Sequence, residues 1–175
     1  HLAALLDNAQ ACLPSTLVLG GEAPGAQLLE RIHQLAPHAR VFNHYGPTEA
    51  TVGVLVQRLQ ADAPAQGFAQ VLAGNRVYVL TAEGQLAGVG ELGELHLAGR
   101  QLCRGYLGGD NAEARFIDNP LRAGERLYRT GDLARYQADG SILLQGRQDH
   151  QVKIRGFRIE LAEVEACLLA LDGIA

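Results

Sequence analysis

The sequence predicts a mixed α/β fold in two parts, and three observations support this. A β-favouring run ends at Gly20 and leads into a helical pattern and a second short β run, which together form a strand–helix–strand unit. After Thr51 the chain changes to short β-favouring runs separated by glycine-bearing turns, which is typical of antiparallel sheet. A hairpin pattern and a helical pattern follow near the end of the printed sequence, and they predict a second, smaller unit.

The first strand is expected over residues 15–19, and Pro24 stands where a proline is tolerated in the first turn of a helix. Apolar side chains then recur at helical spacing at Leu28, Leu29, Ile32 and Leu35. Pro37 ends this pattern, because proline disfavours the helical conformation in the residue before it. A second strand is expected over residues 41–43.

Three further strands are expected in the antiparallel region, over residues 76–80, 94–98 and 141–144. Residues 60–70 are rich in alanine with one proline, and they predict a loose loop. The residues therefore predict a region of antiparallel β structure.

The second unit is expected to begin near Asp149. Residues 151–154 and 157–159 flank Arg155 and Gly156, which favours a hairpin. The following helix, expected within residues 160–171, has one apolar face, formed by Leu161, Val164, Leu168 and Leu171. We therefore predict a division into residues 1–148 and 149–175.

The composition argues against several classes of function. The formal charge is −4 at pH 7, whereas a nucleic-acid groove needs clustered basic residues. The apolar runs are far shorter than the roughly 20 residues of a membrane helix, so no membrane insertion is expected. The cysteines Cys12, Cys103 and Cys167 lie outside any CxxC spacing, and the six histidines show no paired metal-ligand spacing. A reducing, cytoplasmic setting is expected.

Residues 43–49 combine side chains that suit a nucleotide. The ring of Tyr45 can stack on a base, and the turn at Gly46 lets backbone N–H groups approach a phosphate. The hydroxyl of Thr48 and the carboxylate of Glu49 suit a phosphate oxygen and a hard cation such as Mg²⁺. The alternative is an ordinary β-turn with proline at its second position.

Two later segments permit similar alternatives. Asp132 follows Gly131 and could hold neighbouring ribose hydroxyls, or it is an ordinary turn aspartate. Residues 146–156 place cations beside glycines, which suits either phosphate recognition or a solvated hairpin face. The sequence contains neither a GxSxG nucleophile motif nor a GxxxxGK[ST] phosphate loop.

Together and in this order, four motifs resemble the core motifs of the adenylation domains of nonribosomal peptide synthetases. They cover residues 43–49, residues 93–99 with 104–107, residues 128–133, and residues 146–165. The resemblance implies that residues 1–148 form the C-terminal portion of a large N-terminal subdomain, including the barrel-like region. Residues 149–175 would then be the hinge and the start of a small, mobile C-terminal subdomain.

The resemblance also implies an ATP-dependent ligase. Such an enzyme joins ATP and an amino acid into an aminoacyl adenylate with the help of Mg²⁺, and then passes the acyl group to the phosphopantetheine thiol of a peptidyl carrier domain. Neighbouring synthetase domains are further expected partners. The family's phosphate loop and its substrate-binding lysine lie outside the printed sequence, so these residues alone are expected to be inactive. An acyl- or aryl-CoA ligase and a degenerate interaction domain are the alternatives.

The resemblance assigns expected roles to the nucleotide-binding residues. Tyr45 would stack on adenine and Asn43 would contact its edge. Gly46 and Thr48 would face the phosphates, with Thr48 on the α-phosphate, and Glu49 would hold Mg²⁺.

In the later motifs, Asp132 would bind the ribose hydroxyls and Arg147 would reach the ribose or a phosphate. Asp149 would be the hinge, and the loop that begins at Lys153 would enter the site for thioester formation. The sequence departs from the family at Leu144, where an aromatic residue is common.

By the same resemblance, the side chains that face the amino acid are Val18, Gly20, His44, Val52 and Gly53. This set resembles the pocket associated with aspartate, because His44 is its polar member and can donate a hydrogen bond or a charge to a carboxylate. Asparagine is the nearest alternative substrate.

Overall fold

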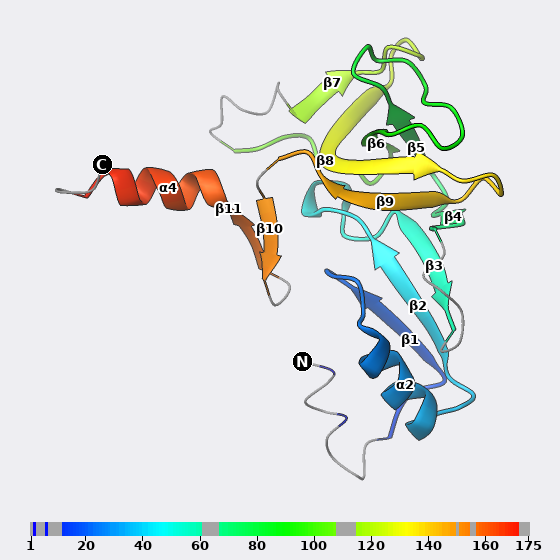
Figure 1. Cartoon of the computed structure of the whole chain (residues 1–175). Coiled ribbons are helices and arrows are strands. Elements are labelled where there is room, and N and C mark those ends of the chain that lie inside the picture. Colours follow the sequence, from blue (N-terminus) through cyan, green and yellow to red (C-terminus); the bar gives the residue numbers. More distant parts are fainter. Residues whose placement is uncertain are drawn as a thin grey trace.

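The computed structural model describes residues 2, 6, 12–60, 67–107, 115–149, 151–154 and 157–171 (Figure 1). Among the described residues, three groups of strands follow one another, with α-helix α2 (Ala26–Leu35) in the first group and α4 (Leu161–Leu169) at the end of the third. Within the described ranges, no helix is both long and apolar enough to cross a membrane.

The first group is a four-stranded sheet in the order β1-β2-β3-β4. Strand β1 (Thr16–Gly20) runs parallel to β2 (Arg40–Tyr45), and helix α2 (Ala26–Leu35) connects them. Strands β3 (Leu55–Leu59) and β4 (Gln70–Val71) continue the sheet in antiparallel pairs. The predicted strand–helix–strand unit is confirmed.

Helix α2 places its apolar face on this sheet. Ile32 is 1% exposed and packs with Val41 of β2. The helix begins at Ala26 with Gly25 as its N-cap, so Pro24 precedes the helix and does not occupy its first turn as expected. The helix ends before Pro37, as the proline predicted.

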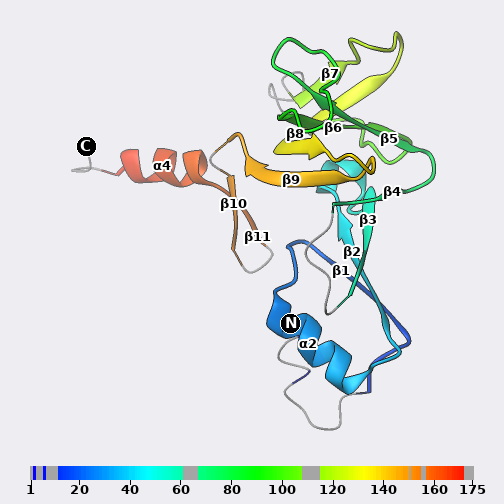
Figure 2. The ribbon, with the colours of Figure 1, turned by 45° about the vertical axis from the view of Figure 1, so that its right-hand side comes forward.

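The second group is an antiparallel sheet in the order β5-β6-β8-β7, with β9 paired to β8. The bounds of its strands are β5 Asn75–Leu80, β6 Gly93–Gly99, β7 Phe116–Asp118, β8 Arg126–Tyr136 and β9 Ile142–Arg147. In Figures 1 and 2, β9 lies between β8 and the first sheet. Phe68 joins the two sheets, because its backbone forms an antiparallel bridge with Ile142. The predicted antiparallel region is confirmed.

Strand β8 was not predicted as a strand. Asp132 lies inside it, so the turn interpretation of this residue is wrong. Gly131 adopts a left-handed φ of 74°, and the pairing of β8 with β6 and β9 shifts register next to it. The glycine therefore forms a bulge inside a long strand, which bends the strand without ending it.

The third group contains β10 (Gln151–Ile154), β11 (Phe157–Glu160) and helix α4 (Leu161–Leu169). Within the described part of the chain, these strands pair with each other alone, in antiparallel register, and the group lies apart from the two larger sheets in Figures 1 and 2. The predicted hairpin and helix are found. A boundary at residue 149 agrees with this arrangement and remains a proposal.

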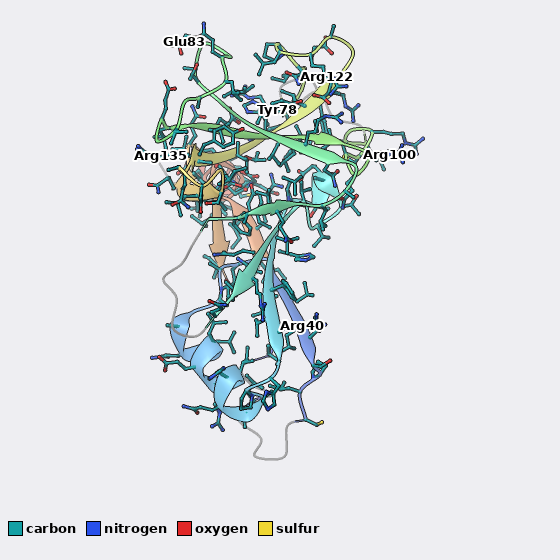
Figure 3. The ribbon with its side chains drawn as sticks, turned by 90° about the vertical axis from the view of Figure 1, so that its right-hand side faces the viewer. Arg40, Tyr78, Glu83, Arg100, Arg122 and Arg135 are labelled. Atoms are coloured by element: carbon teal, nitrogen blue, oxygen red, sulfur yellow. The ribbon has the colours of Figure 1, made fainter. Side chains whose placement is uncertain are left out.

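The main core lies between the first two sheets. Leu55 of β3 and Leu95 and Leu97 of β6 are all 0% exposed and belong to one apolar cluster. Figure 3 shows Arg100 pointing away from the five-stranded sheet. Apolar contacts thus hold one end of the first sheet against the five-stranded sheet, and polar residues gather where the two sheets meet (Figures 1 and 3).

Candidate functional site

A cavity of about 470 Å³ lies between the two larger sheets. Its lining includes the loop that follows β1, the end of β2, Phe68, and parts of β8 and β9. The carboxyl ends of the parallel strands β1 and β2 both reach it, which is where ligands commonly bind in α/β sheets. Three of the four motifs singled out in the sequence therefore meet at one place.

Asp132 connects the two sheets at this cavity. The hydroxyl of Tyr45 donates to its Oδ2 atom, and Nη1 of Arg147 donates to its Oδ1 atom at 2.7 Å. The side chains of Asp132 and Arg147 are 14% and 16% exposed. Because both bonds are charge-assisted and shielded from solvent, they hold the carboxylate in one orientation.

Tyr45 stays neutral in this arrangement. Burial raises the pKa of its hydroxyl, and the negative charge of Asp132 raises it further. Its ring also packs beside Phe68, with the centroids 5.8 Å apart. Tyr45 therefore keeps its proton and donates a hydrogen bond to Asp132, while its ring borders the cavity.

Asp149 is anchored beside the same arginine. It accepts hydrogen bonds from Nε and Nη2 of Arg147, at 2.7 and 2.8 Å, and from Nη2 of Arg115 at 3.0 Å. Burial opposes its ionised form, but these donors outweigh burial and lower its pKa to about 2. A Cβ atom on Gly131 would lie 2.6 Å from the Oδ2 atom of Asp149, so this bulge requires glycine for its space as well as for its φ.

Glu49 lies in a short 3-10 helix, η1 (Thr48–Ala50), and is 6% exposed. Nη1 of Arg158 donates to both of its carboxylate oxygens at 2.9 Å, and the hydroxyl of Tyr106 donates to Oε1 at 2.5 Å. Burial raises the pKa of Glu49, but the bond from Tyr106 and the charge of Arg158 more than offset burial, so the pKa lies below its ordinary value. Glu49 is therefore ionised at neutral pH.

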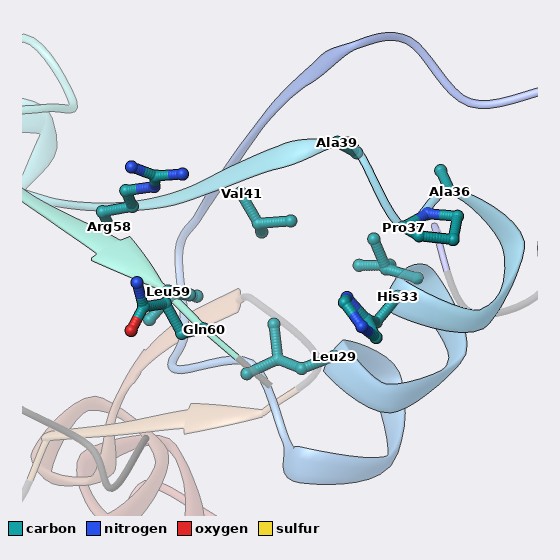
Figure 4. Close-up of a pocket in the computed structure, with 10 residues that line it drawn as sticks. Leu29, His33, Ala36, Pro37, Ala39, Val41, Arg58, Leu59 and Gln60 are labelled. Atoms are coloured by element: carbon teal, nitrogen blue, oxygen red, sulfur yellow. The ribbon is translucent and has the colours of Figure 1, made fainter. Parts of the chain in front are cut away.

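A second, smaller cavity of about 270 Å³ lies between α2 and the strands β2 and β3 (Figure 4). Its walls are mostly apolar, with His33 and Arg58 as its charged or titratable members. None of the residues predicted for nucleotide or substrate binding lines it. The cavity at Asp132 is therefore the candidate site.

Comparison with known sequences identifies the family. Residues 2–107, more than half of the chain, match the AMP-binding enzyme family. The chain belongs to this family. The recognition of its ordered motifs as those of an adenylation domain is confirmed.

Relatives of this AMP-binding chain include peptide synthetases. It is 42% identical over 158 residues to tyrocidine synthase 3 of Brevibacillus parabrevis, covering 90% of the chain and 2% of that protein. It is 47% identical over 154 residues to novobiocin biosynthesis protein H of Streptomyces niveus, covering 87% of the chain and 25% of that protein.

Solved structures of the family share the fold. PA1221, an NRPS protein containing adenylation and PCP domains, superposes with a TM-score of 0.80 at 30% identity, covering 91% of this chain and 33% of that one. The Vibrio cholerae adenylation domain AlmE, in complex with glycyl-adenosine-5'-phosphate, gives 0.75 at 31% identity, covering 87% and 30%. The chain thus spans about a third of these structures, and a far smaller share of a long synthetase such as tyrocidine synthase 3.

Five residues expected to bind the nucleotide line the cavity of this AMP-binding chain: Asn43, Tyr45, Gly46, Asp132 and Arg147. Leu144, where the family often has an aromatic residue, lines it as well. Thr48 is exposed and Glu49 is buried, and both lie in η1, directly after the cavity-lining end of β2. The sequence therefore identified residues that the fold brings together.

Three of the residues expected around the amino acid are neighbours. Gly20 pairs with His44 in the register of β1 and β2. A Cβ atom on Gly53 would lie 2.8 Å from Nδ1 of His44, so the glycine leaves the space that this ring occupies. Val18 and Val52 are 55% and 65% exposed in this chain.

Some functional contacts were not assigned from the sequence. Arg158 and Tyr106 lie inside quoted motifs, yet nothing local indicates that both contact Glu49. Arg115 lies outside every motif, and its partner Asp149 is 34 residues away. The side chain of Lys153, together with residues 155 and 156 of the same loop, lies outside the described residues.

The residues of η1 offer one carboxylate, that of Glu49, as a ligand for Mg²⁺. Within the described part of the chain, no three His, Cys, Asp or Glu side chains gather as a metal site. Glu49 nevertheless presents an ionised carboxylate whose two oxygens already face a cation, the guanidinium of Arg158. Mg²⁺ is commonly held by one or two carboxylates together with water and substrate phosphates, so this donor set suits a metal that arrives with a nucleotide.

Proposed function

We propose that this chain binds the nucleotide in an adenylation domain that activates an amino acid for nonribosomal peptide synthesis. The reaction would join ATP and the amino acid into an aminoacyl adenylate and release pyrophosphate. The observation that carries the proposal is the cluster of Tyr45, Asp132 and Arg147 at the cavity between the sheets. Membership of the AMP-binding family supports the same chemistry.

Asp132 is suited to bind the ribose hydroxyls. An ionised carboxylate has about four lone-pair sites, and the two hydrogen bonds from Tyr45 and Arg147 use two of them. The remaining sites can accept hydrogen bonds from two neighbouring hydroxyls. Tyr45 and Arg147 thereby orient the acceptor before the nucleotide arrives.

Arg147 acts mainly as the residue that positions Asp132. A guanidinium has five N–H groups. Four hydrogen bonds lead from Arg147 to Asp132, to Asp149 twice and to the carbonyl oxygen of Thr130. One N–H group is left to reach the ribose or a phosphate.

Thr48 and Glu49 would serve the phosphate end of ATP. The exposed hydroxyl of Thr48 would bind the α-phosphate, and the carboxylate of Glu49 would hold Mg²⁺. Bound Mg²⁺ supplies positive charge that stabilises the phosphate oxygens during the displacement. The chain's own contribution is to place this carboxylate at a fixed position relative to Asp132, which lowers the cost of orienting the nucleotide.

The proposed substrate is aspartate, with asparagine as the alternative. His44 pairs with Gly20 in the sheet, and Gly53, which has no side chain, leaves room beside the His44 ring. A histidine in this position can donate a hydrogen bond to a side-chain carboxylate. The AlmE domain, which has a similar fold, is solved in complex with glycyl-adenosine-5'-phosphate, and this supports an aminoacyl adenylate as the intermediate here.

The proposed acceptor is the phosphopantetheine thiol of a peptidyl carrier domain, and neighbouring synthetase domains would be further partners. PA1221 contains an adenylation domain together with a PCP domain, which supports this pairing. In the second half-reaction, residues after Asp149 would reorient so that the loop beginning at Lys153 enters the site.

Amino-acid-dependent exchange of pyrophosphate into ATP by the complete domain tests the proposal. We expect exchange that depends on ATP, on Mg²⁺ and on an amino acid, with aspartate giving the highest rate. A preference for an apolar amino acid would refute the aspartate assignment and leave the reaction class intact. Absence of exchange with every common amino acid, in a domain that binds ATP, would refute amino-acid activation.

A further inference from the structure

Glu49 is held by side chains from two other parts of the chain. Arg158 of β11 contacts both carboxylate oxygens, and Tyr106 contacts Oε1. The Glu49 side chain is 8% exposed and that of Arg158 is 31% exposed, so the carboxylate is shielded from water and the arginine is partly buried. A shielded, doubly hydrogen-bonded arginine–carboxylate pair is a specific contact and differs in strength from an exposed surface pair.

This ion pair joins the hairpin to the large sheets. Arg158 and Glu49 are 109 positions apart in the sequence, and Arg158 lies on a strand that pairs only with β10. Figures 1 and 2 show the hairpin and α4 apart from the other sheets, and the Arg158 side chain of β11 donates to Glu49 of η1. If the hydrogen bonds between Arg158 and Glu49 were broken, β11 would therefore be held less tightly against η1.

A metal ion on Glu49 would compete with this contact. Mg²⁺ needs oxygen ligands at about 2.0–2.1 Å in an octahedral arrangement. Nη1 of Arg158 lies 2.9 Å from both carboxylate oxygens, on the side where the two oxygens open. A divalent ion and a guanidinium on the same carboxylate would also repel each other strongly at such distances.

We propose that Arg158 and Mg²⁺ alternate as the cation on Glu49, so that the β10–β11 hairpin is docked without the metal and released when the metal–nucleotide complex binds. The inference rests on the proposed function, in which Glu49 holds Mg²⁺. Arg158 is a positioning residue, because it acts on the metal site through Glu49. Tyr106 can keep its single hydrogen bond to Oε1 in both states.

The first test measures Mn²⁺ binding by electron paramagnetic resonance, using the complete domain and a non-hydrolysable ATP analogue. We expect Arg158→Gln to bind Mn²⁺ roughly 5-fold or more tightly than the wild type, since the competing cation is gone. Arg158→Lys, which keeps the charge, should return the affinity toward the wild-type value. Arg100→Gln removes the same charge at an exposed position and should change nothing (Figure 3). Damage to the fold would weaken metal binding, which is opposite to the expected effect.

The second test follows amide hydrogen exchange in residues 151–154 and 157–160. In the wild type, exchange should accelerate when Mn²⁺ and the ATP analogue are added. In Arg158→Gln it should already be fast without them and change little on their addition. Unchanged hairpin exchange in the wild type on metal–nucleotide binding would overturn the proposed release.

Glu49→Gln separates failure of this inference from failure of the proposed function. If Glu49→Gln weakens Mn²⁺ binding while Arg158→Gln binds like the wild type, the alternation is wrong and the metal role of Glu49 stands. If Glu49→Gln binds Mn²⁺ as the wild type does, Glu49 is not a metal ligand, and both the metal assignment and the alternation fail.

Discussion

At the scale of single residues, the site depends on acceptors whose orientation is set by arginine and tyrosine. Asp132 receives one hydrogen bond at each oxygen, from Tyr45 and from Arg147. Asp149 receives bonds from Arg147 and Arg115, so one arginine connects two aspartates. Substituting Asp132 should therefore affect the proposed nucleotide binding, and substituting either aspartate leaves Arg147 partly unpaired.

Asp132→Ala should weaken ATP binding by the complete domain by about 2–3 kcal/mol, because charge-assisted hydrogen bonds to the ribose are lost. Isothermal titration calorimetry with ATP measures the change. Asp139→Ala is the matched control, since Asp139 is an exposed aspartate whose side chain bonds to Ser141 in the turn before β9. Near-normal ATP affinity in Asp132→Ala would refute the ribose role.

His44→Leu should erode the preference for aspartate over asparagine by about 1–3 kcal/mol, because the side-chain carboxylate of the bound aspartate would lose the hydrogen-bond donor His44. Gly53→Ala should have a similar effect without removing the histidine, since the added Cβ would lie 2.8 Å from Nδ1 of His44. Gly25→Ala adds the same methyl group in open space and serves as the control. The ratio of exchange rates with the two amino acids measures the effect, and an unchanged ratio in both pocket variants contradicts the assignment.

At the scale of elements, the segment that joins β9 to β10 is held by Asp149 at the proposed hinge. The backbone N–H of Gln151 donates to Asp149, and that of Gln148 donates to the carbonyl oxygen of Gly131 in the bulge of β8. Gln148 and Asp149 are therefore tied to the residues on both sides of the proposed hinge. A change of orientation must break part of this network.

Asp149→Pro should hinder the second half-reaction more than the first, because proline fixes φ at the proposed pivot. The substitution also removes the carboxylate, so Asp149→Ala, which loses the same hydrogen bonds and keeps the backbone free, is the necessary control. Adenylation is measured by pyrophosphate exchange and transfer by loading of a carrier domain. Equal slowing of both steps in Asp149→Pro would place the pivot elsewhere.

The stabilising effect of Asp149 should depend on pH. Its folded-state pKa of about 2 lies below the ordinary value of 3.8, so its contribution is present above about pH 4 and is lost as the pH falls toward 2. The wild type should melt at a higher temperature than Asp149→Asn at pH 6, and the difference should shrink below pH 4. Thermal unfolding of both proteins across this range measures it, and a difference that grows with acidity would contradict the sign.

At the scale of the whole molecule, the two larger sheets enclose one apolar core, and polar contacts join them at its edge. Tyr45 belongs to the core cluster, and its hydroxyl crosses to Asp132 on the other sheet. The same pair borders the cavity. We therefore expect stability and the proposed nucleotide binding to be coupled at this contact.

Tyr45→Phe should lower the free energy of unfolding of the complete domain by about 1.5–3 kcal/mol, since it removes a hydrogen bond to a charged group and keeps the ring. Tyr136→Phe is a comparison within the same core region, because its hydroxyl accepts a hydrogen bond from the neutral backbone N–H of Val79, and it should cost less. Urea denaturation measures both. A smaller loss in Tyr45→Phe than in Tyr136→Phe would contradict the importance of the link between sheets.

The sequence by itself determined the features that depend on neighbouring residues. Helical spacing predicted the span of α2, period-two runs and glycine turns predicted β5, β6 and the β10–β11 hairpin, and the order of the motifs indicated the family. These succeed because backbone propensity and side-chain periodicity are local properties.

The tertiary structure alone decided which side chains meet. Gly131 has the local character of a turn, but pairing on both sides of β8 makes it a bulge in a strand. Likewise, nothing near Arg158 in the sequence shows that Glu49, 109 positions away, accepts its hydrogen bonds. Such contacts arise from the packing of distant segments around a common core, and their energies depend on burial, which periodicity in the sequence does not specify.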